Sequence, residues 1–278
     1  YNIMINLLII ILFILLILFL HLCRNKEGFQ PLNLKYDVLF SKKTPYNNID
    51  IVKFEKNKHG LDKCLYLNDE IQLCNNKEYR YHEILVHYPA SYIKNIENVL
   101  IVGGGDCMTL REVLKYDSLK SVKMLEIDKD VIDISNKFFK TSSFENDPRV
   151  EIIIGDASKT VKKLQNNNYD LIIIDTTEIG KSNRSIDKVS FYKDLKLKMK
   201  KDGIVVKNGD NLLCYNAFES IFRNKKIFKT KYSLLTDFES DIYLFMMFSD
   251  KEFSNIKCHN VRKLKYYNCN IHDNFSQI

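Results

Sequence analysis

The sequence has no tryptophan and is poor in the residues that make chains flexible or repetitive. Its 278 residues include nine glycines and four prolines, which excludes a collagen-like chain and leaves little room for long flexible linkers. Hydrophobic residues make up 45% and charged residues 28%, so an intrinsically disordered chain and a membrane protein with many spans are also excluded. The length predicts one large globular domain or two smaller ones.

The chain also lacks the cysteine patterns of a metal site or of a disulfide-stabilised secreted domain. It has seven cysteines, an odd number, with no Cys-x-x-Cys motif and no cysteine and histidine pair at a zinc spacing. We therefore expect no bound metal, and we expect reduced, structural thiols in a reducing compartment.

Positive charge exceeds negative charge, with 42 Lys and Arg against 35 Asp and Glu and a formal charge of +7. Such an excess is typical of proteins that bind nucleic acid or an anionic membrane, and equally of a lysine-rich surface in water. The lysines between positions 188 and 201 lie on a predicted helix, and aromatic residues do not alternate with them as they do in single-strand binders. A solvated surface is therefore favoured, and no nucleic-acid partner is predicted.

Asp, Glu, Lys and Arg are absent from residues 3–22, which are almost entirely apolar. About 20 such residues in a helix cross the hydrocarbon layer, so this segment predicts an N-terminal transmembrane anchor. A cleaved signal peptide is the alternative, but no basic residue precedes the apolar run and no small-residue cleavage site follows it. Residues 23–48, a predicted juxtamembrane linker, contain several basic residues. They predict a single-pass membrane protein whose main domain lies on the cytoplasmic side.

Residues 49–253 show two patterns of apolar residues. Within 49–78, short alternating runs separated by turns predict a small antiparallel β-hairpin module. Within 79–253, continuous apolar runs alternate with helical stretches, which predicts an α/β domain with a doubly wound, mostly parallel sheet. The polar C-terminal tail, 254–278, has no role that we can read from its sequence. The strands expected in the α/β domain are 99–102, 122–126, 150–154, 171–174, 203–206 and a late antiparallel strand at 243–248.

Acidic residues follow each of the first four strands of the predicted parallel sheet. Carboxyl ends of parallel strands meet at one edge of a sheet, where ligands bind. Helix N-capping would explain one such acid, but four at one edge favour a binding site. The four strands are followed, in order, by Gly103-Gly104-Gly105-Asp106, by Glu126 and Asp128, by Gly155-Asp156-Ala157, and by Asp175-Thr176-Thr177-Glu178.

The glycine loop at 103–105 differs from that of a dinucleotide-binding protein. It lacks the spaced Gly-x-Gly-x-x-Gly pattern, and Asp106 stands where a phosphate would have to approach. A carboxylate attracts an amine instead. The pattern therefore suits a nucleoside with a cationic tail, of which S-adenosylmethionine and its decarboxylated form are examples.

Several blocks of the sequence, in order and spacing, resemble the spermidine synthase family of polyamine aminopropyltransferases. The resemblance runs from about Ile49 to Asp250 and is specific only when the blocks are taken together. The blocks are Leu65-Tyr66-Leu67-Asn68-Asp69-Glu70-Ile71-Gln72-Leu73, Tyr81-His82-Glu83, Val99 to Asp106 with Thr109-Leu110-Arg111-Glu112-Val113-Leu114, Leu125-Glu126-Ile127-Asp128, Asp147-Pro148-Arg149-Val150 and Gly155-Asp156-Ala157.

This resemblance implies a Rossmann-like, methyltransferase-type domain behind an N-terminal β-hairpin module, usually in a homodimer. It also implies transfer of the aminopropyl group of decarboxylated S-adenosylmethionine, a co-substrate, to a putrescine-like diamine or a polyamine, with release of methylthioadenosine and without a permanently bound cofactor or a metal. The roles carried over are the cofactor-binding loop Gly103, Gly104 and Gly105; Asp106 on the aminopropyl amine; Glu126 on the ribose hydroxyls; Asp156 with Ala157 at the adenine; Tyr81, His82 and Glu178 at the acceptor amine; and Asp175 as the catalytic acid group.

The sequence departs from the family mainly on the acceptor side. Glu178 and Ile179 replace the family's second Asp and its following Pro, and Cys107 replaces a glycine. Ile49 stands where the family often has Gln, and Phe238-Glu239-Ser240-Asp241 replaces Tyr-Pro-Ser-Gly. The alternatives are a nucleoside-binding relative that transfers another group or is inactive, an S-adenosylmethionine-dependent methyltransferase, and a non-catalytic membrane scaffold.

Overall fold

The computed structural model describes residues 34–57, 60–141, 144, 146–177, 185–209, 216, 218–229, 244–274 and 276–277. Residues from Tyr36 onward pack as one unit. This unit contains two sheets, one of four strands and one of eight.

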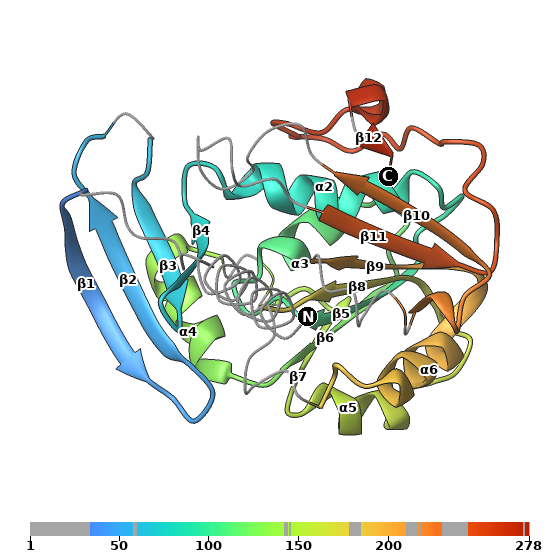
Figure 1. The fold of residues 1–278 in the computed structure, drawn as a ribbon, viewed down its shortest axis with the longest axis horizontal. Coiled ribbons are helices and arrows are strands. Elements are labelled where there is room, and N and C mark those ends of the chain that lie inside the picture. Colours follow the sequence, from blue (N-terminus) through green and yellow to red (C-terminus); the bar gives the residue numbers. More distant parts are fainter. Residues whose placement is uncertain are drawn as a thin grey trace, which may run out of the picture. The chain divides into compact units, whose positions relative to one another are not determined.

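The four-stranded sheet is an antiparallel meander of β1 (Tyr36–Lys43), β2 (Asn48–Phe54), β3 (Lys63–Leu67) and β4 (Glu70–Cys74) (Figure 1). Strands β3 and β4 are joined by Asn68 and Asp69, both at positive φ, the two-residue turn that suits a hairpin. Ile49 and Ile51 are buried and alternate with more exposed residues along β2. They pack in one cluster with Met108 and Ile134, which belong to the α/β domain. The expected β module is therefore present and is fixed beside the glycine loop.

Strand β1 corrects one expectation, because residues 36–43 belong to a strand rather than to a linker. Its side chains are mostly exposed, as in many edge strands. An edge strand of this kind has no buried face and so leaves no alternating apolar pattern in the sequence.

The eight-stranded sheet has the order β12-β10-β11-β9-β8-β5-β6-β7. The neighbouring strands among β7, β6, β5, β8 and β9 run parallel to one another. The pairs β9–β11, β11–β10 and β10–β12 are antiparallel. This confirms the mostly parallel sheet and the late antiparallel strand, and it adds β10, whose lysine-rich sequence hides it. The bounds are β5 (Asn98–Gly103), β6 (Ser121–Glu126), β7 (Val150–Ile154), β8 (Tyr169–Asp175), β9 (Met199–Asn208), β10 (Asn224–Lys229), β11 (Leu244–Ser249) and β12 (Ser276–Gln277).

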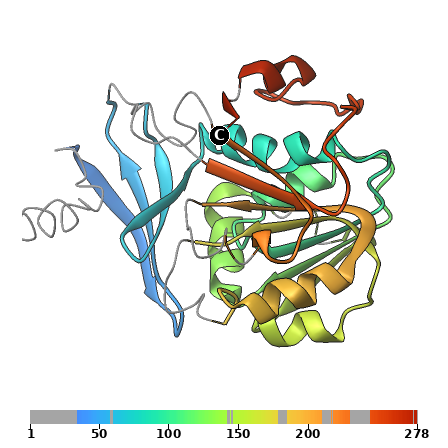
Figure 2. The same cartoon turned by 45° about the vertical axis from the view of Figure 1, so that its right-hand side comes forward.

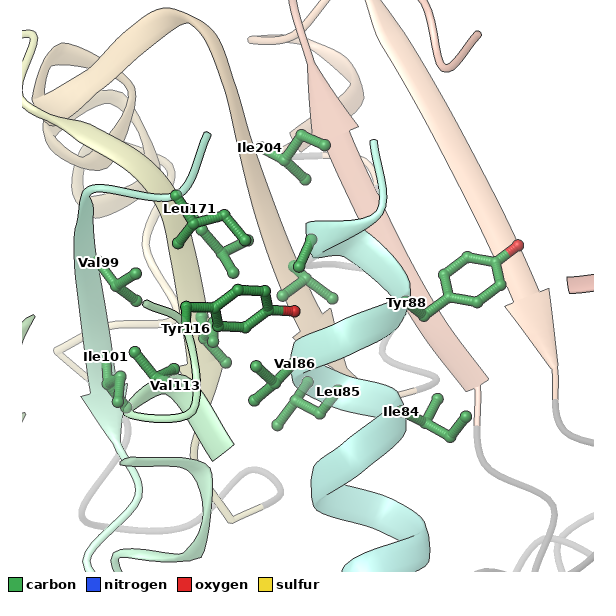
Figure 3. Close-up of a cluster of buried hydrophobic side chains, with 14 of the residues drawn as sticks. Ile84, Leu85, Val86, Tyr88, Val99, Ile101, Val113, Tyr116, Leu171 and Ile204 are labelled. Atoms are coloured by element: carbon green, nitrogen blue, oxygen red, sulfur yellow. The ribbon is translucent and has the colours of Figure 1, made fainter. Parts of the chain in front are cut away.

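Helices cover both faces of this sheet, with α2 and α3 on one side and α5 and α6 on the other (Figure 2). Alternate residues of β5 show why: Val99 and Ile101 lie on the side of α2 (Figure 3). Leu100 and Val102 belong to the opposite core. Strands buried on both faces are apolar throughout, as their sequences are. The helices are α2 (Glu78–Ala90), α3 (Met108–Val113), α4 (Lys129–Phe139), α5 (Ala157–Thr160) continued by η1 (Val161–Lys163), α6 (Val189–Lys198) and η3 (Cys269–Asn274).

The C-terminal tail packs against α2. The buried carboxylate of Glu83 accepts hydrogen bonds from the backbone N–H groups of Lys265, Tyr266 and Tyr267, each at 2.8 Å. His259 Nε2 also lies 2.9 Å from the carbonyl oxygen of Ile93, just after the helix. The tail thus fastens to the helix that carries Tyr81 and His82.

The expectation that the cysteines are reduced is wrong for two pairs. Cys64 and Cys74 form a disulfide between β3 and β4, and Cys258 and Cys269 form one within the tail. Pairing of β3 with β4 brings Cys64 opposite Cys74, which the sequence spacing does not reveal. Among the described residues, Cys107 is the free thiol, and it is buried.

The prediction of a single-pass membrane protein with its main domain in the cytoplasm is also wrong as far as the structure reaches. None of the described helices is both long enough and apolar enough to span a bilayer. The apolar stretch 3–22, on which the prediction depended, lies outside the described residues.

Candidate active site

The glycine loop lies directly against the end of β8. Gly103 pairs with Asp175 across β5 and β8, and the Gly104 N–H donates to the carbonyl oxygen of Asp175 at 2.7 Å. Gly103 has φ +81°, and a side chain there would overlap this same carbonyl oxygen. Glycine is therefore required at 103 for the loop to meet β8.

Cys107 does not crowd the site. It has φ +64°, a conformation that suits the glycine it replaces in the family pattern. Its side chain is buried in the apolar cluster beneath α2, together with Leu110 and Ile101. The substitution therefore adds its side chain to the core.

Asp175, at the end of β8, is held by hydrogen bonds to both of its carboxylate oxygens. Tyr81 donates its hydroxyl hydrogen to Oδ1 at 3.0 Å, and Thr109 donates to Oδ2 at 2.5 Å. Burial raises the pKa of Asp175, and the charge of Asp106 adds to this, whereas His82 and the two hydrogen bonds oppose it. A carboxylate with a raised pKa accepts a proton more readily than a solvated one.

His82 lies fully buried between two acids. Its Nδ1 is 2.7 Å from the Glu78 carbonyl oxygen and 3.0 Å from Glu78 Oε2, and its Nε2 is 3.4 Å from Asp106 Oδ2. Burial lowers the pKa of His82, but the charges and hydrogen bonds of Asp106 and Glu78 outweigh it and raise this pKa well above its usual value. His82, Asp106 and Asp175 each place an atom within 4.8 Å of the other two. The structure thus brings three predicted residues together around one small space.

Asp106 is fixed by the helix that follows it. Its Oδ1 accepts the backbone N–H of Met108, the first residue of α3, at 2.8 Å. Its Oδ2 is the oxygen that faces His82. The side chain of Asp106 is 15% exposed, so it remains within reach of a bound cation.

Glu126, at the end of β6, is a buried carboxyl beside the glycine loop. A side chain at Gly105 would come within 2.9 Å of Glu126 Oε2, so the absence of one leaves this oxygen accessible from the loop. The Asp128 N–H donates to Oε1 at 2.9 Å. Burial raises the pKa of Glu126 from 4.5 to about 7, and the charges of Asp128 and Asp106 contribute.

Two of the acids at the sheet edge also cap helices, which is the alternative role that helix N-capping offers for such residues. Asp128 caps α4 and accepts hydrogen bonds from Thr44 and Asn47 in the turn between β1 and β2. Asp156 caps α5, and its Oδ1 accepts from the Ser158 backbone and hydroxyl and from the Ser185 hydroxyl. Burial raises the pKa of Asp156, but these hydrogen bonds outweigh it and lower the pKa.

Other predicted acceptor-side residues, Glu178 and the stretch 238–241, lie outside the described residues. Conversely, no site role was predicted for Glu78, Thr109 or Arg111, although the last two lie in one of the blocks that carry the resemblance. Arg111 forms a two-point ion pair with Glu78, with nitrogen–oxygen distances of 2.9 and 2.8 Å. The four-residue spacing of Glu78 and His82 on one helix face was a signal for the contact between these two side chains, but not for the ion pair of Glu78 with Arg111.

Comparison with known proteins gives a consistent result. A model of the spermine/spermidine synthase domain matches residues 78–258. The polyamine aminopropyltransferase of Thermoanaerobacter sp. (strain X514) is 32% identical over 247 residues, which cover 85% of this chain and 87% of that protein. Spermidine synthase 2 of Arabidopsis thaliana is 31% identical over 258 residues, covering 84% and 74% respectively.

Solved structures agree. A spermidine synthase crystallised with the transition state analogue AdoDATO superposes with a TM-score of 0.77 at 25% identity, covering 90% of this chain and 94% of that one. The spermidine synthase of Thermotoga maritima gives a TM-score of 0.73 at 27% identity, covering 86% and 84%.

Proposed function

This chain belongs to the spermine/spermidine synthase family and is an aminopropyltransferase that uses decarboxylated S-adenosylmethionine as its co-substrate, and we propose that Asp175 is its catalytic base. The observation that carries this proposal is the placement of Asp175 beside Tyr81, Asp106 and His82 at the carboxyl edge of the sheet. The acceptor is an amine, because the site offers carboxylates and no cluster of basic residues among those described.

The proposed reaction is a displacement at carbon. The acceptor nitrogen attacks the methylene carbon bound to the sulfonium sulfur, the carbon–sulfur bond breaks, and its electron pair stays on sulfur in methylthioadenosine. The attacking nitrogen becomes cationic and passes its extra proton to Asp175. Because the sulfonium is already a good leaving group, the main tasks left to the protein are alignment and proton removal.

The nucleoside half of the site would use residues on three neighbouring strands. Glu126 would accept hydrogen bonds from the ribose hydroxyls, and Asp156 with Ala157 would bind the adenine. Asp106 would hold the aminopropyl ammonium group, next to the loop of Gly103, Gly104 and Gly105. The carboxylates of Asp106 and Glu126 both border this loop, which supports one ligand spanning the two.

The acceptor half would be formed by Tyr81 and His82 on α2 together with Glu178.

We also propose that the protein is a homodimer. Exposed apolar side chains on β1, at Tyr36, Val38 and Leu39, support a further protein contact along this edge. Sedimentation analysis of the full chain gives its oligomeric state directly, and a monomer at all concentrations would remove this part of the proposal.

The test of Asp175 uses the full chain with decarboxylated S-adenosylmethionine and a panel of diamines and polyamines. Release of methylthioadenosine, followed by mass spectrometry, identifies the acceptor. We expect Asp175→Asn to lower kcat about a hundredfold or more, because the proton would lose its acceptor. Asp133→Asn, which changes an exposed acid paired with Lys129 on α4, is the matched control. Near-full turnover by a folded Asp175→Asn protein would overturn the assignment.

A further inference from the structure

A chain of charged residues runs from the site into the interior along α2 and α3. Arg111 bonds both oxygens of Glu78 and also donates its Nε–H to Glu112 Oε1 at 2.9 Å. Glu112 is fully buried and takes further hydrogen bonds from Lys115 at 2.6 Å and from His87 at 2.9 Å. Arg111 therefore fixes the position of the Glu78 carboxylate, whose Oε2 also lies 3.0 Å from His82 Nδ1.

The ring of His82 has oxygen acceptors at both ends. Glu78 offers its carbonyl oxygen and Oε2 to Nδ1, and Asp106 offers Oδ2 to Nε2. A neutral imidazole carries one N–H and would leave one of these ends without a hydrogen to share. The imidazolium form donates at both ends, so the geometry selects the charged ring.

We propose that Glu78 is a positioning residue that, fixed by Arg111, holds His82 as an imidazolium and thereby favours the neutral, nucleophilic form of the acceptor amine beside Asp175. This inference rests on the proposed function. It assigns control of the charge on His82 to Glu78 and Arg111, which are not among the residues placed at the acceptor amine.

The charges facing His82 explain the effect on the amine. An ammonium group next to a fixed imidazolium is repelled, so the bound amine loses its proton more readily than in water. Two carboxylates alone would act in the opposite direction and hold the amine as an unreactive ammonium ion. The groups that face His82 are Glu78 and Tyr81 on α2, Asp106 in the glycine loop and Asp175 at the end of β8, with Arg111 behind Glu78.

The test is the dependence of kcat on pH in Glu78→Gln, His82→Gln and the double variant. Glu78→Gln keeps the shape of the side chain and removes its charge, so the pKa of His82 should fall, although Asp106 still supports the charged ring, and the bound amine should keep its proton more readily. We expect kcat to fall at neutral pH by about tenfold for each unit by which the pKa of the amine rises. Activity should recover toward wild type at alkaline pH, where the amine is neutral without help.

If Glu78 acts on the amine through His82, the pH shifts of the two single variants should not add in the double variant. His82→Gln should shift the acid limb in the same direction, and adding Glu78→Gln to it should produce no further shift. Glu151→Gln, an exposed acid paired with Lys123, is the control and should keep the wild-type profile. A loss of kcat that is uniform across pH, an unshifted profile, or additive shifts in the double variant would each overturn the inference.

A measurement without turnover separates this inference from the proposed function. NMR titration of histidine-labelled full chain, with the signal assigned by His82→Gln, reports the charge of the ring. The inference expects His82 to stay protonated well above its usual pKa of 6.5 and its pKa to fall in Glu78→Gln. A wild-type ring that titrates at or below 6.5 overturns it even if no amine is a substrate, whereas a protonated ring in a protein that releases no methylthioadenosine refutes the proposed function alone.

Discussion

The buried carboxyl of Glu126 should make nucleoside binding depend on pH near neutrality. Burial, together with the charges of Asp128 and Asp106, raises its pKa to about 7. Two ribose hydroxyls need an ionised carboxylate as their common acceptor. Below pH 7 the protein must therefore release a proton from Glu126 to bind methylthioadenosine, and above pH 7 it is already ionised.

The magnitude follows from this pKa. A pKa of about 7 leaves about a tenth of Glu126 ionised at pH 6 and about nine tenths at pH 8. The Kd for methylthioadenosine should then fall about tenfold between these pH values, or about 1.4 kcal/mol. Calorimetry in two buffers of different ionisation enthalpy should detect release of about one proton at pH 6 and almost none at pH 8.

Two variants decide whether Glu126 is the group responsible. Glu126→Gln should bind more weakly at pH 8 and lose the pH dependence, whereas Glu151→Gln should retain it. Equal wild-type affinity at pH 6 and pH 8, or the same pH dependence in Glu126→Gln, would refute the reasoning.

The same shift affects the stability of the free protein. Folding raises the pKa of Glu126 from 4.5 to about 7. The contribution of this shift to the free energy of unfolding is therefore fully present below pH 4.5 and is lost as pH rises through 7. The loss is about 3 kcal/mol at most. Denaturant unfolding of the wild type and Glu126→Gln at pH 5 and pH 8 should therefore show the variant gaining stability, relative to wild type, at the higher pH.

Two further substitutions test the scaffold around the site. Gly103→Ala should cost about 1–3 kcal/mol or more and lower kcat, since it strains the backbone at φ +81° and pushes against the carbonyl oxygen of Asp175; an unchanged melting temperature would contradict this. Glu83→Ala removes the acceptor of three backbone N–H groups in 265–267, of which that of the buried Tyr267 would cost about 1–3 kcal/mol when left unpaired. Trypsin should then cut this basic tail faster than in wild type, and an equal cleavage rate would show that the carboxylate does not hold it.

Continuous apolar strands explain how much of the fold was predictable. Strands such as β5 and β8 are buried on both faces by helices, so they must be apolar at every position, and the sequence shows this directly. Strands β1 and β10 escaped detection because their apolar runs are short, Val38-Leu39-Phe40 in β1 and Ile227-Phe228 in β10, and polar or charged residues flank them. Strand β10 receives its hydrogen bonds from β11 and β12, which come later in the chain, and its lysine-rich sequence does not record this pairing.

The candidate site was predictable for a topological reason. Parallel strands end at one edge of the sheet, so acids placed after β5, β6, β7 and β8 had to meet there. What such a rule cannot supply is the set of contacts between helices. The ion pair of Arg111 with Glu78, and through it the charge of His82, depends on how α2 packs against α3.

The sequence by itself thus determined the α/β class, the carboxylates at the sheet edge and the family, because these depend on local periodicity and on the order of strands. The tertiary structure decided the protonation of the site. A carboxyl at the end of a strand has an ordinary pKa until burial removes its water and neighbouring charges replace it. The raised pKa values of Asp175 and Glu126, and the charged ring of His82, arise only when segments remote in the chain enclose them together.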